Sequence, residues 1–185
     1  MSDLILPELI ESKMVLDEFV KVRKDVLSFP RKKRHSYFVV STFPESVCIV
    51  ALSDTKELLV LEEYRHPTKQ LIFGLPGGHL DHGENPLEAA ERELLEETGC
   101  TASNFEIIGE HFPLPALYDH KTYVVLATKA EKTQEPSLDE METLRSSFMK
   151  IQDVTAHLQN TKKADGILCA ALLFMQIHSA RSETS

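Results

Sequence analysis

The chain has few cysteines, and the three that it has lie far apart. Cys48, Cys100 and Cys169 form no CxxC pair and no Cys/His spacing of the kind found in zinc sites. This excludes the disulfide framework that stabilises small secreted domains. Scattered thiols in a chain of 185 residues are typical of a reducing compartment, so we expect a cytoplasmic protein.

Long hydrophobic runs are missing as well. The longest apolar stretch, residues 167–177, is interrupted by Gln176 and is too short to span a bilayer. The first residues include the acids Asp3, Glu8 and Glu11 and lack the apolar segment of a signal peptide. We therefore expect no membrane partner, and we expect the apolar stretch 167–177 to lie in a buried helix.

Positive charge is also scarce. The formal net charge is −9 at pH 7, which argues against nucleic acid or an anionic membrane as the main partner. The exception is the basic segment 30–34, which is more typical of a solvated hairpin loop than of a nucleic-acid site.

What the sequence does have is a group of glutamates at helical spacing. Glu93, Glu96 and Glu97 lie three and four residues apart, so they share one helix face with Cβ atoms about 5–6 Å apart. Two carboxylates about 6 Å apart repel by roughly 3 kcal/mol at an effective dielectric of about 20. Pairing with Arg92 would explain a solvated face, but a bound cation offsets the repulsion better. Oxygen ligands suit a hard ion such as Mg²⁺ or Mn²⁺.

These glutamates belong to a longer pattern. Residues 78–100 follow G-x5-E-x7-R-E-U-x-E-E-x-G-U, where U is a bulky apolar residue, and only Cys100 at the last position departs from it. The matching residues are Gly78, Glu84, Arg92, Glu93, Leu94, Glu96, Glu97 and Gly99. Eight residues at fixed spacing are far more specific than a lone glycine motif. The segment resembles the box of the Nudix hydrolases, which cleave a nucleoside diphosphate linked to another moiety.

The expected elements agree with this resemblance. Strand-like runs precede one central helix, more strands follow, and two helices close the chain, which favours a mixed sheet covered by helices. The strands are expected in residues 14–29, 36–42, 46–52, 57–64, 105–112, 123–130 and 146–151, and the closing helices in 152–159 and 164–180. The resemblance implies a Nudix-type α/β/α sandwich with the box as loop–helix–loop. We expect N-terminal strands and the basic turn in residues 1–35, as a dimerisation arm, and a Nudix domain in residues 36–185.

The box helix has clear local signals at both ends. Asn85 and Pro86 are favoured at the N-cap and at the first helical position. Gly99 supplies the C-terminal stop. The core-facing stripe is expected to be Leu87, Ala89, Ala90 and Leu94.

The resemblance implies that the box binds metal. The implied ligands of Mg²⁺ or Mn²⁺, with two or more ions, are Glu93, Glu96, Glu97 and the backbone carbonyl of Gly77. Such ions neutralise phosphoryl oxygens and lower the pKa of a bound water. Arg92 is expected to orient the carboxylates. For Glu84, binding a metal through water and capping the helix are equally open, since acids are favoured at helix N-termini.

Two flanking segments resemble the ADP-ribose and nucleotide-sugar subgroup of the family. Tyr64 and Arg65 precede the turn at residues 75–78, and the resemblance implies that Arg65 holds a substrate phosphate through a bidentate contact. A salt bridge at the end of a strand is the alternative. Downstream, Pro115 lies close to the subgroup's loop proline, and Tyr118 either stacks on the base of the substrate or packs.

This loop departs from the subgroup at the place of a catalytic glutamate. Asp119 and His120 stand there instead. Histidine has a pKa suited to proton transfer near neutrality. The general base is therefore one of these two residues or a box glutamate, Glu96 or Glu97. A loop histidine without a chemical role is the alternative for His120.

Together, these features predict metal-dependent hydrolysis of the pyrophosphate bond of ADP-ribose or a related nucleoside diphosphate sugar. The products would be a nucleoside monophosphate and a sugar phosphate. Hydrolysis of nucleoside triphosphates or dinucleoside polyphosphates is the alternative within the family, and a non-catalytic nucleotide-binding regulator is the alternative of a different class. The subgroup resemblance also implies a homodimer, in which the N-terminal strands contribute to the partner's site.

Overall fold

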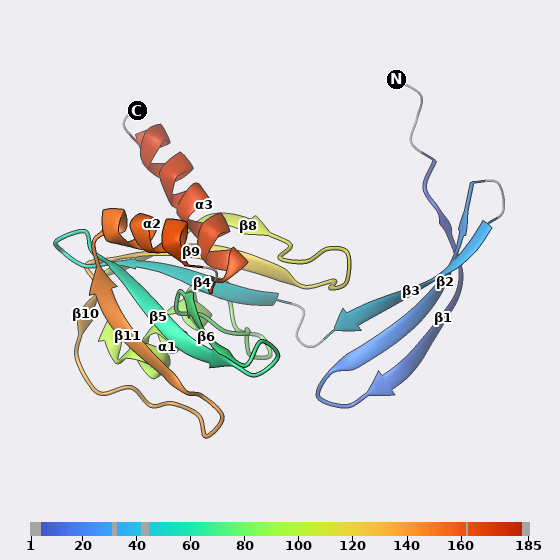
Figure 1. The fold of residues 1–185 in the computed structure, drawn as a ribbon, viewed down its shortest axis with the longest axis horizontal. Coiled ribbons are helices and arrows are strands. Elements are labelled where there is room, and N and C mark those ends of the chain that lie inside the picture. Colours follow the sequence, from blue (N-terminus) through green and yellow to red (C-terminus); the bar gives the residue numbers. More distant parts are fainter. Residues whose placement is uncertain (1–4, 31–32, 42–44, 162, 183–185) are drawn as a thin grey trace. The chain divides into compact units, whose positions relative to one another are not determined.

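A computed structural model describes residues 5–30, 33–41, 45–161 and 163–182. The chain forms two compact units (Figure 1). Unit 1 comprises Met1–Pro44 and Phe112–Lys121, and unit 2 comprises Glu45–His111 and Thr122–Ser185. Among the helices of the described ranges, none is long and apolar enough to cross a membrane. The domain division after residue 35 stays a prediction.

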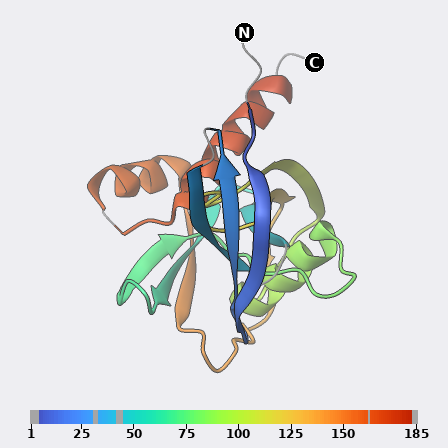
Figure 2. The same ribbon diagram turned by 90° about the vertical axis from the view of Figure 1, so that its right-hand side faces the viewer.

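Unit 1 is built on a three-stranded antiparallel sheet, whose strands run side by side in Figure 2. The strands are β1 (Glu8–Asp17), β2 (Lys21–Phe29) and β3 (Lys33–Ser41). The strand character expected in residues 14–29 is confirmed, but this stretch contains two strands. β1 begins at Glu8, earlier than expected. Its start was missed because all of its residues are exposed, so its sequence lacks the alternation of a half-buried strand. The basic turn was expected at residues 30–34, but Lys33 and Arg34 belong to β3, and residues 31–32 lie outside the described ranges.

Unit 2 contains a six-stranded mixed sheet in the order β11-β5-β4-β9-β8, with β6 paired to β5. The strands are β4 (Glu45–Leu52), β5 (Leu58–Arg65), β6 (Gln70–Gly74), β8 (Asn104–His111), β9 (Lys121–Thr128) and β11 (Leu144–Met149). A small second sheet pairs β7 (Cys100–Thr101) with β10 (Glu131–Lys132). The helices are α1 (Pro86–Thr98), α2 (Ile151–Asn160) and α3 (Gly166–Ser182).

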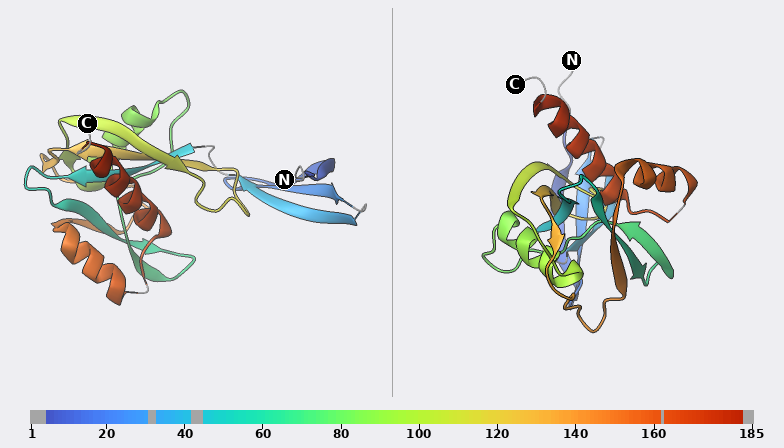
Figure 3. Two further views of the ribbon diagram at one scale, coloured as in Figure 1. Left: turned by 90° about the horizontal axis from the view of Figure 1, so that it is seen from above. Right: turned by 90° about the vertical axis from the view of Figure 1, so that its left-hand side faces the viewer.

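The central strand β4 shows why both faces of this sheet are covered. Successive side chains of a strand point to opposite faces, and nearly all of β4 is buried. One face packs against α1, through Val47, Ile49, Ala51, Ala89, Ala90 and Leu94. The other packs against α2 and α3, through Cys48, Val50, Val154, Leu168 and Ala171. Figures 1 and 3 show these helices on opposite sides of the sheet, which confirms the expected α/β/α sandwich.

The expected signals at the ends of α1 are confirmed. The side chain of Asn85 accepts hydrogen bonds from the N–H groups of Leu87 and Glu88, and the carboxylate of Glu88 accepts one from the backbone N–H of Asn85. Pro86 opens the helix, and Gly99 ends it with a left-handed φ of 69°. The expectation for Leu87 is wrong, because Leu87 is exposed. The buried part of the stripe begins at Ala89, so the first turn of α1 extends beyond the packed part of the helix.

Candidate functional site

The candidate site lies where a glycine turn meets α1. Residues 76–78 are fixed to β4, because the N–H groups of Ile49 and Val47 donate to the carbonyls of Pro76 and Gly78, both at 2.8 Å. Gly77 lies between them with a φ of 153°. A Cβ atom added to Gly77 would lie 2.2 Å from the carbonyl oxygen of Val47. Only glycine fits this position without a shift of the backbone.

The next residue, Gly78, makes room for a carboxylate of the helix. A Cβ atom added to Gly78 would lie 2.2 Å from Oε1 of Glu93. The carboxyl group of Glu93 therefore occupies the space that a side chain at position 78 would need. The position of this carboxylate, rather than that of the helix backbone, depends on the missing side chain.

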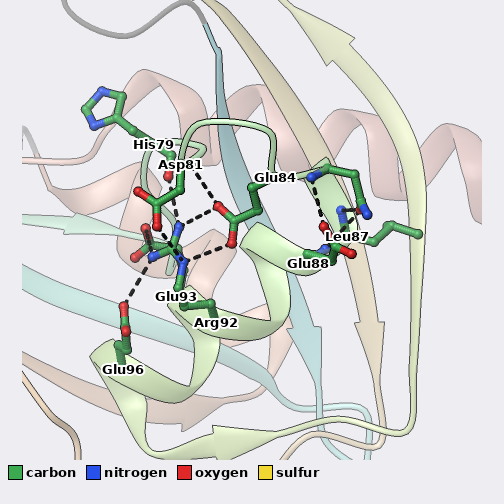
Figure 4. Close-up of polar contacts among 9 residues, drawn as sticks. His79, Asp81, Glu84, Leu87, Glu88, Arg92, Glu93 and Glu96 are labelled. Atoms are coloured by element: carbon green, nitrogen blue, oxygen red, sulfur yellow. Dashed lines mark hydrogen bonds and ion pairs between the residues drawn. The ribbon is translucent and has the colours of Figure 1, made fainter.

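Arg92 connects the carboxylates of the box (Figure 4). Its Nε and Nη2 donate to the two oxygens of Glu84, at 3.0 and 2.9 Å. Its Nη1 donates to Glu93 at 2.8 Å and to Glu96 at 3.2 Å, and Nη2 also donates to the carbonyl of His79 at 3.0 Å. Hydrogen bonds with Glu84 raise the pKa of Arg92 above its usual value. One guanidinium group thus orients three acids.

Glu84 does not cap the helix, because Asn85 does. Besides the bonds from Arg92, its Oε2 accepts a hydrogen bond from the N–H of Asp81 at 2.9 Å. The Arg92 hydrogen bond holds the pKa of Glu84 below its usual range. Glu84 is therefore a charged support for Arg92.

Glu97 lies at the centre of the negative charge. It is 6% exposed, and its Oε2 accepts a hydrogen bond from the N–H of Gly77 at 2.8 Å. Burial raises the pKa of Glu97 to about 8, although the Gly77 hydrogen bond lowers it. The charges of Glu93, Glu63 and Glu142 contribute to this raised pKa of Glu97. Burial also raises the pKa of Glu93.

Glu63 contributes to this site although the sequence did not single it out. It follows Leu59 on β5 by four residues, and Leu59 belongs to the core on the α1 side. Strand alternation therefore points Glu63 to the α1 side as well, a signal that was readable from the sequence. Burial raises the pKa of Glu63, and the nearby Arg65 lowers it.

Glu142 is the second acid that sequence reasoning missed. It lies before β11, which pairs with β5 so that Leu144 stands opposite Glu63. Its Oε2 accepts a hydrogen bond from the N–H of Asp139 at 3.0 Å, and its charge raises the pKa of Glu63, Glu93 and Glu97. Its segment has no helical or strand period, so only the pairing of β11 with β5 reveals its place.

The donors of this site fit a hard divalent cation. Four carboxyl groups interact here, and the pKa of three of them is raised because their charges accumulate in a partly buried place. A cation relieves that repulsion, and oxygen ligands are those that Mg²⁺ and Mn²⁺ prefer. Within the described ranges, no three His, Cys, Asp or Glu side chains are already gathered as a ligand set. Arg92 and the Gly77 N–H hold oxygens of Glu93 and Glu97.

Tyr64 and Arg65 lie at the end of β5, two residues or fewer from Glu63. Nη1 of Arg65 lies 2.6 Å from a carboxylate oxygen of Glu63. The hydroxyl of Tyr64 lies 3.4 Å from Nδ1 of His66, and Tyr64 is exposed. Arg65 therefore forms a strand-end salt bridge, which was the alternative to a phosphate contact, and its partner Glu63 is an acid of the site.

The loop residues Pro115, Tyr118, Asp119 and His120 fold with unit 1, whereas Gly77 and the box fold with unit 2. Within unit 1, the hydroxyl of Ser41 donates to both carboxylate oxygens of Asp119, at 2.8 and 2.9 Å. Nη1 of Arg23 lies 3.8 Å from Asp119 Oδ2. Asp119 thus attaches the loop to β2 and β3.

Comparisons with known proteins agree with this geometry. The model of the NUDIX domain matches residues 42–170. The chain is 29% identical to the ADP-ribose pyrophosphatase of Bacillus subtilis (strain 168) over 177 residues, which cover 95% of this chain and 93% of that protein. It is 25% identical to the methanol dehydrogenase activator of Bacillus methanolicus over 162 residues, 87% of each chain. A crystal structure of an ADP compounds hydrolase superposes with a TM-score of 0.85 and 23% identity, covering 98% of each chain.

Proposed function

The chain belongs to the Nudix family of hydrolases, and we propose that it hydrolyses the pyrophosphate bond of ADP-ribose or a related nucleoside diphosphate sugar. The products are a nucleoside monophosphate and a sugar phosphate. One observation carries the proposal: the buried Glu97 accepts a hydrogen bond from the Gly77 turn and interacts with the charges of Glu63, Glu93 and Glu142. The similarity over nearly the whole chain to an ADP-ribose pyrophosphatase supports this substrate class.

The site would hold Mg²⁺ or Mn²⁺, in two or more ions. The proposed ligands are Glu93, Glu96, Glu97 and the carbonyl of Gly77, with Glu63 and Glu142 as further carboxylates. Such ions neutralise phosphoryl oxygens and make bound water more acidic. The carbonyls of Pro76 and Gly78 accept hydrogen bonds from β4. Since successive carbonyls of extended backbone alternate in direction, the carbonyl of Gly77 is directed away from β4.

The positive side chains of the site complement this role. Arg92 would hold Glu93 and Glu96 in place through the contacts described above, with Glu84 as its support. Arg65 would exchange its contact with Glu63 for a substrate phosphate, because a planar guanidinium group binds phosphate in a bidentate manner. Tyr64, Pro115 and Tyr118 would bind other parts of the substrate.

For the general base, we favour Glu142 over the loop residues. Its charge acts on Glu93 and Glu97, so it belongs with the acids of the site. The carboxylate of Asp119 is held by Ser41, which suits it less for proton transfer. His120 is the competing candidate, and variants of both residues decide between them.

A second copy of the chain would cover unit 1. The sheet exposes apolar side chains, among them Leu9 at 56%, Met14 at 45% and Val15 at 49%. Exposed apolar surface on an edge strand favours association. We therefore propose a homodimer in which the N-terminal strands take part. Light scattering tests this, and a monomer at micromolar concentration would contradict it.

A substrate panel tests the activity. Purified protein is incubated with ADP-ribose, nucleotide sugars, nucleoside triphosphates and dinucleoside polyphosphates, each with Mg²⁺, Mn²⁺ or EDTA, and the products are identified. We expect a nucleoside monophosphate and a sugar phosphate, and no turnover in EDTA. Release of pyrophosphate or a polyphosphate would favour the alternative enzyme, and binding without turnover would favour a regulator.

The three free thiols are compatible with a cytoplasmic setting.

A further inference from the structure

A hollow of unit 2 lies on the face of the large sheet that carries α2. Its volume is about 420 Å³, within the range of small-molecule sites. Val60, Phe73 and Met149 form its apolar part. Val60 and Phe73 belong to the core on the side of α2 and α3, whereas the box helix α1 covers the other face of the sheet. The hollow is therefore separate from the carboxylates of the box.

One row of paired residues gives this hollow its charge. Glu62 on β5 stands opposite Phe73 on β6 and opposite Arg145 on β11, and residues directly opposite each other share a face of the sheet. Glu62 is two residues from Val60, so strand alternation also puts Glu62 on the α2 side. Glu62 and Arg145 both line the hollow. An acid and a guanidinium group thus lie beside an aromatic ring.

The ion pair between Glu62 and Arg145 is open to exchange. Nε of Arg145 donates a hydrogen bond to Oε2 of Glu62, and Nη2 of Arg145 contacts the same oxygen. The side chain of Arg145 is 76% exposed and that of Glu62 is 34% exposed. Because an ion pair this exposed contributes little to stability, another carboxylate can take the place of Glu62. The planar guanidinium group offers that carboxylate two parallel hydrogen bonds.

An imidazole ring and a hydroxyl group complete the lining. His157 lies in the last turn of α2, and its ring packs on Phe73 with 4.3 Å between the ring centroids and 41° between the ring planes. Ser147 is paired with Val60 and adds a hydrogen-bond donor. Aromatic side chains favour contact with a further ring in offset or edge-to-face geometry. Apolar surface beside several donors suits an aromatic ring that carries one carboxylate.

We propose that this hollow is a second binding site of the protein and takes a small aromatic monocarboxylate. The carboxylate replaces Glu62 as the partner of Arg145, and the ring packs against Phe73, His157 and Val60. A single negative charge is favoured, because Glu62 stays close and repels a second one. The site goes beyond the hydrolysis proposed above and does not depend on it, since the described residues that line it lie outside residues 78–100.

The first test uses benzoate, with benzamide as its neutral counterpart and acetate as a carboxylate without a ring. Each is titrated into ¹⁵N-labelled protein with EDTA present, so that no metal in the box can bind the carboxylate. We expect benzoate to shift the backbone amide signals of Ser147 and His157 to saturation. It should bind on the order of 10-fold more tightly than benzamide or acetate. Equal affinities for benzoate and benzamide, or shifts confined to the box, would overturn the proposal.

The second test changes the two partners of the ion pair, which should act in opposite directions. Arg145→Gln should weaken benzoate binding on the order of 10-fold or more, because it removes the charged donors. Glu62→Gln should strengthen it about 2–5-fold, because it removes an exposed competitor for Arg145. If the pair only stabilised the sheet, both variants would weaken binding alike, and that result would overturn the proposal.

Arg65→Gln is the matched control. Arg65 also pairs with an acid at the end of β5, and its side chain is 51% exposed, but its partner Glu63 belongs to the candidate active site. We expect this variant to keep the affinity for benzoate within about twofold. A loss in Arg65→Gln together with unchanged binding in Arg145→Gln would place the carboxylate at the candidate active site and overturn the proposal. A wild type that binds benzoate through Arg145 but hydrolyses no substrate would contradict the proposed function and support this site.

Discussion

Replacing Glu97 by Gln should stabilise the metal-free protein and abolish its activity. Glutamine has the same shape, and its carbonyl oxygen can still accept the hydrogen bond from Gly77. It removes the buried charge that interacts with Glu93, Glu63 and Glu142. The same position would therefore oppose folding without metal and be required for hydrolysis with metal.

The magnitude follows from the pKa of Glu97, which is raised from 4.5 to about 8 in the folded protein. The folded state then binds more protons than the unfolded state between these two values, so the free energy of unfolding falls as pH rises. One pKa unit corresponds to about 1.4 kcal/mol. From pH 5 to pH 8, the wild type should lose on the order of 4 kcal/mol relative to Glu97→Gln.

The assay is equilibrium unfolding in urea at pH 5, 6, 7 and 8, once with EDTA and once with Mg²⁺. Glu91→Gln is the matched control, because Glu91 is an exposed acid of the same helix. With EDTA, the difference between wild type and Glu97→Gln should grow with pH, whereas Glu91→Gln should follow the wild type. Saturating Mg²⁺ should stabilise the wild type more than Glu97→Gln, because the ion binds only the folded state. Parallel pH profiles in EDTA, or equal stabilisation of both proteins by Mg²⁺, would refute the reasoning.

Three further predictions concern the same site. Gly77→Ala should lower the free energy of unfolding by about 2–4 kcal/mol in urea titrations, because the Cβ atom of the alanine would meet the backbone of Val47. A change below about 0.5 kcal/mol would show that the alanine fits without a clash. Arg92→Lys should lower kcat/KM by on the order of 10–100-fold, because a lysine cannot hold Glu84, Glu93 and Glu96 together, and unchanged kinetics would remove Arg92 from the mechanism. Glu142→Gln should lower kcat by on the order of 10²–10⁴-fold and flatten the rise of kcat with pH, if Glu142 is the general base. His120→Gln should then leave kcat and its pH dependence within about threefold of the wild type. The reverse result would assign the general base to His120.

The box helix could be predicted from the sequence because its signals are local. Asn85, Pro86 and Gly99 act within one or two turns of the helix, and the spacing of Glu93 and Glu97 follows from helix geometry alone. The resemblance that the box carries also led to the sandwich fold. These conclusions needed no knowledge of which strands pair.

The contribution of Glu142 depends on non-local pairing, whereas that of Glu63 follows from strand alternation. Glu142 joins the site because β11 pairs with β5, and no local period in residues 131–143 indicates this. The bond between Ser41 and Asp119 spans 78 residues and was equally beyond sequence patterns. Leu87 was predicted to be buried because its spacing places it on the core-facing stripe of α1. It is exposed, because burial also depends on where the neighbouring layer ends.

The contact between Gly78 and Glu93 has a consequence for substitutions at either position. A methyl group at position 78 would occupy the place of the Glu93 carboxyl group, so the two positions are coupled. An alanine at position 78 would have to displace the Glu93 carboxylate, whereas the shorter side chain of an aspartate at position 93 would make room for the methyl group. The effects of Gly78→Ala and Glu93→Asp should therefore not be additive.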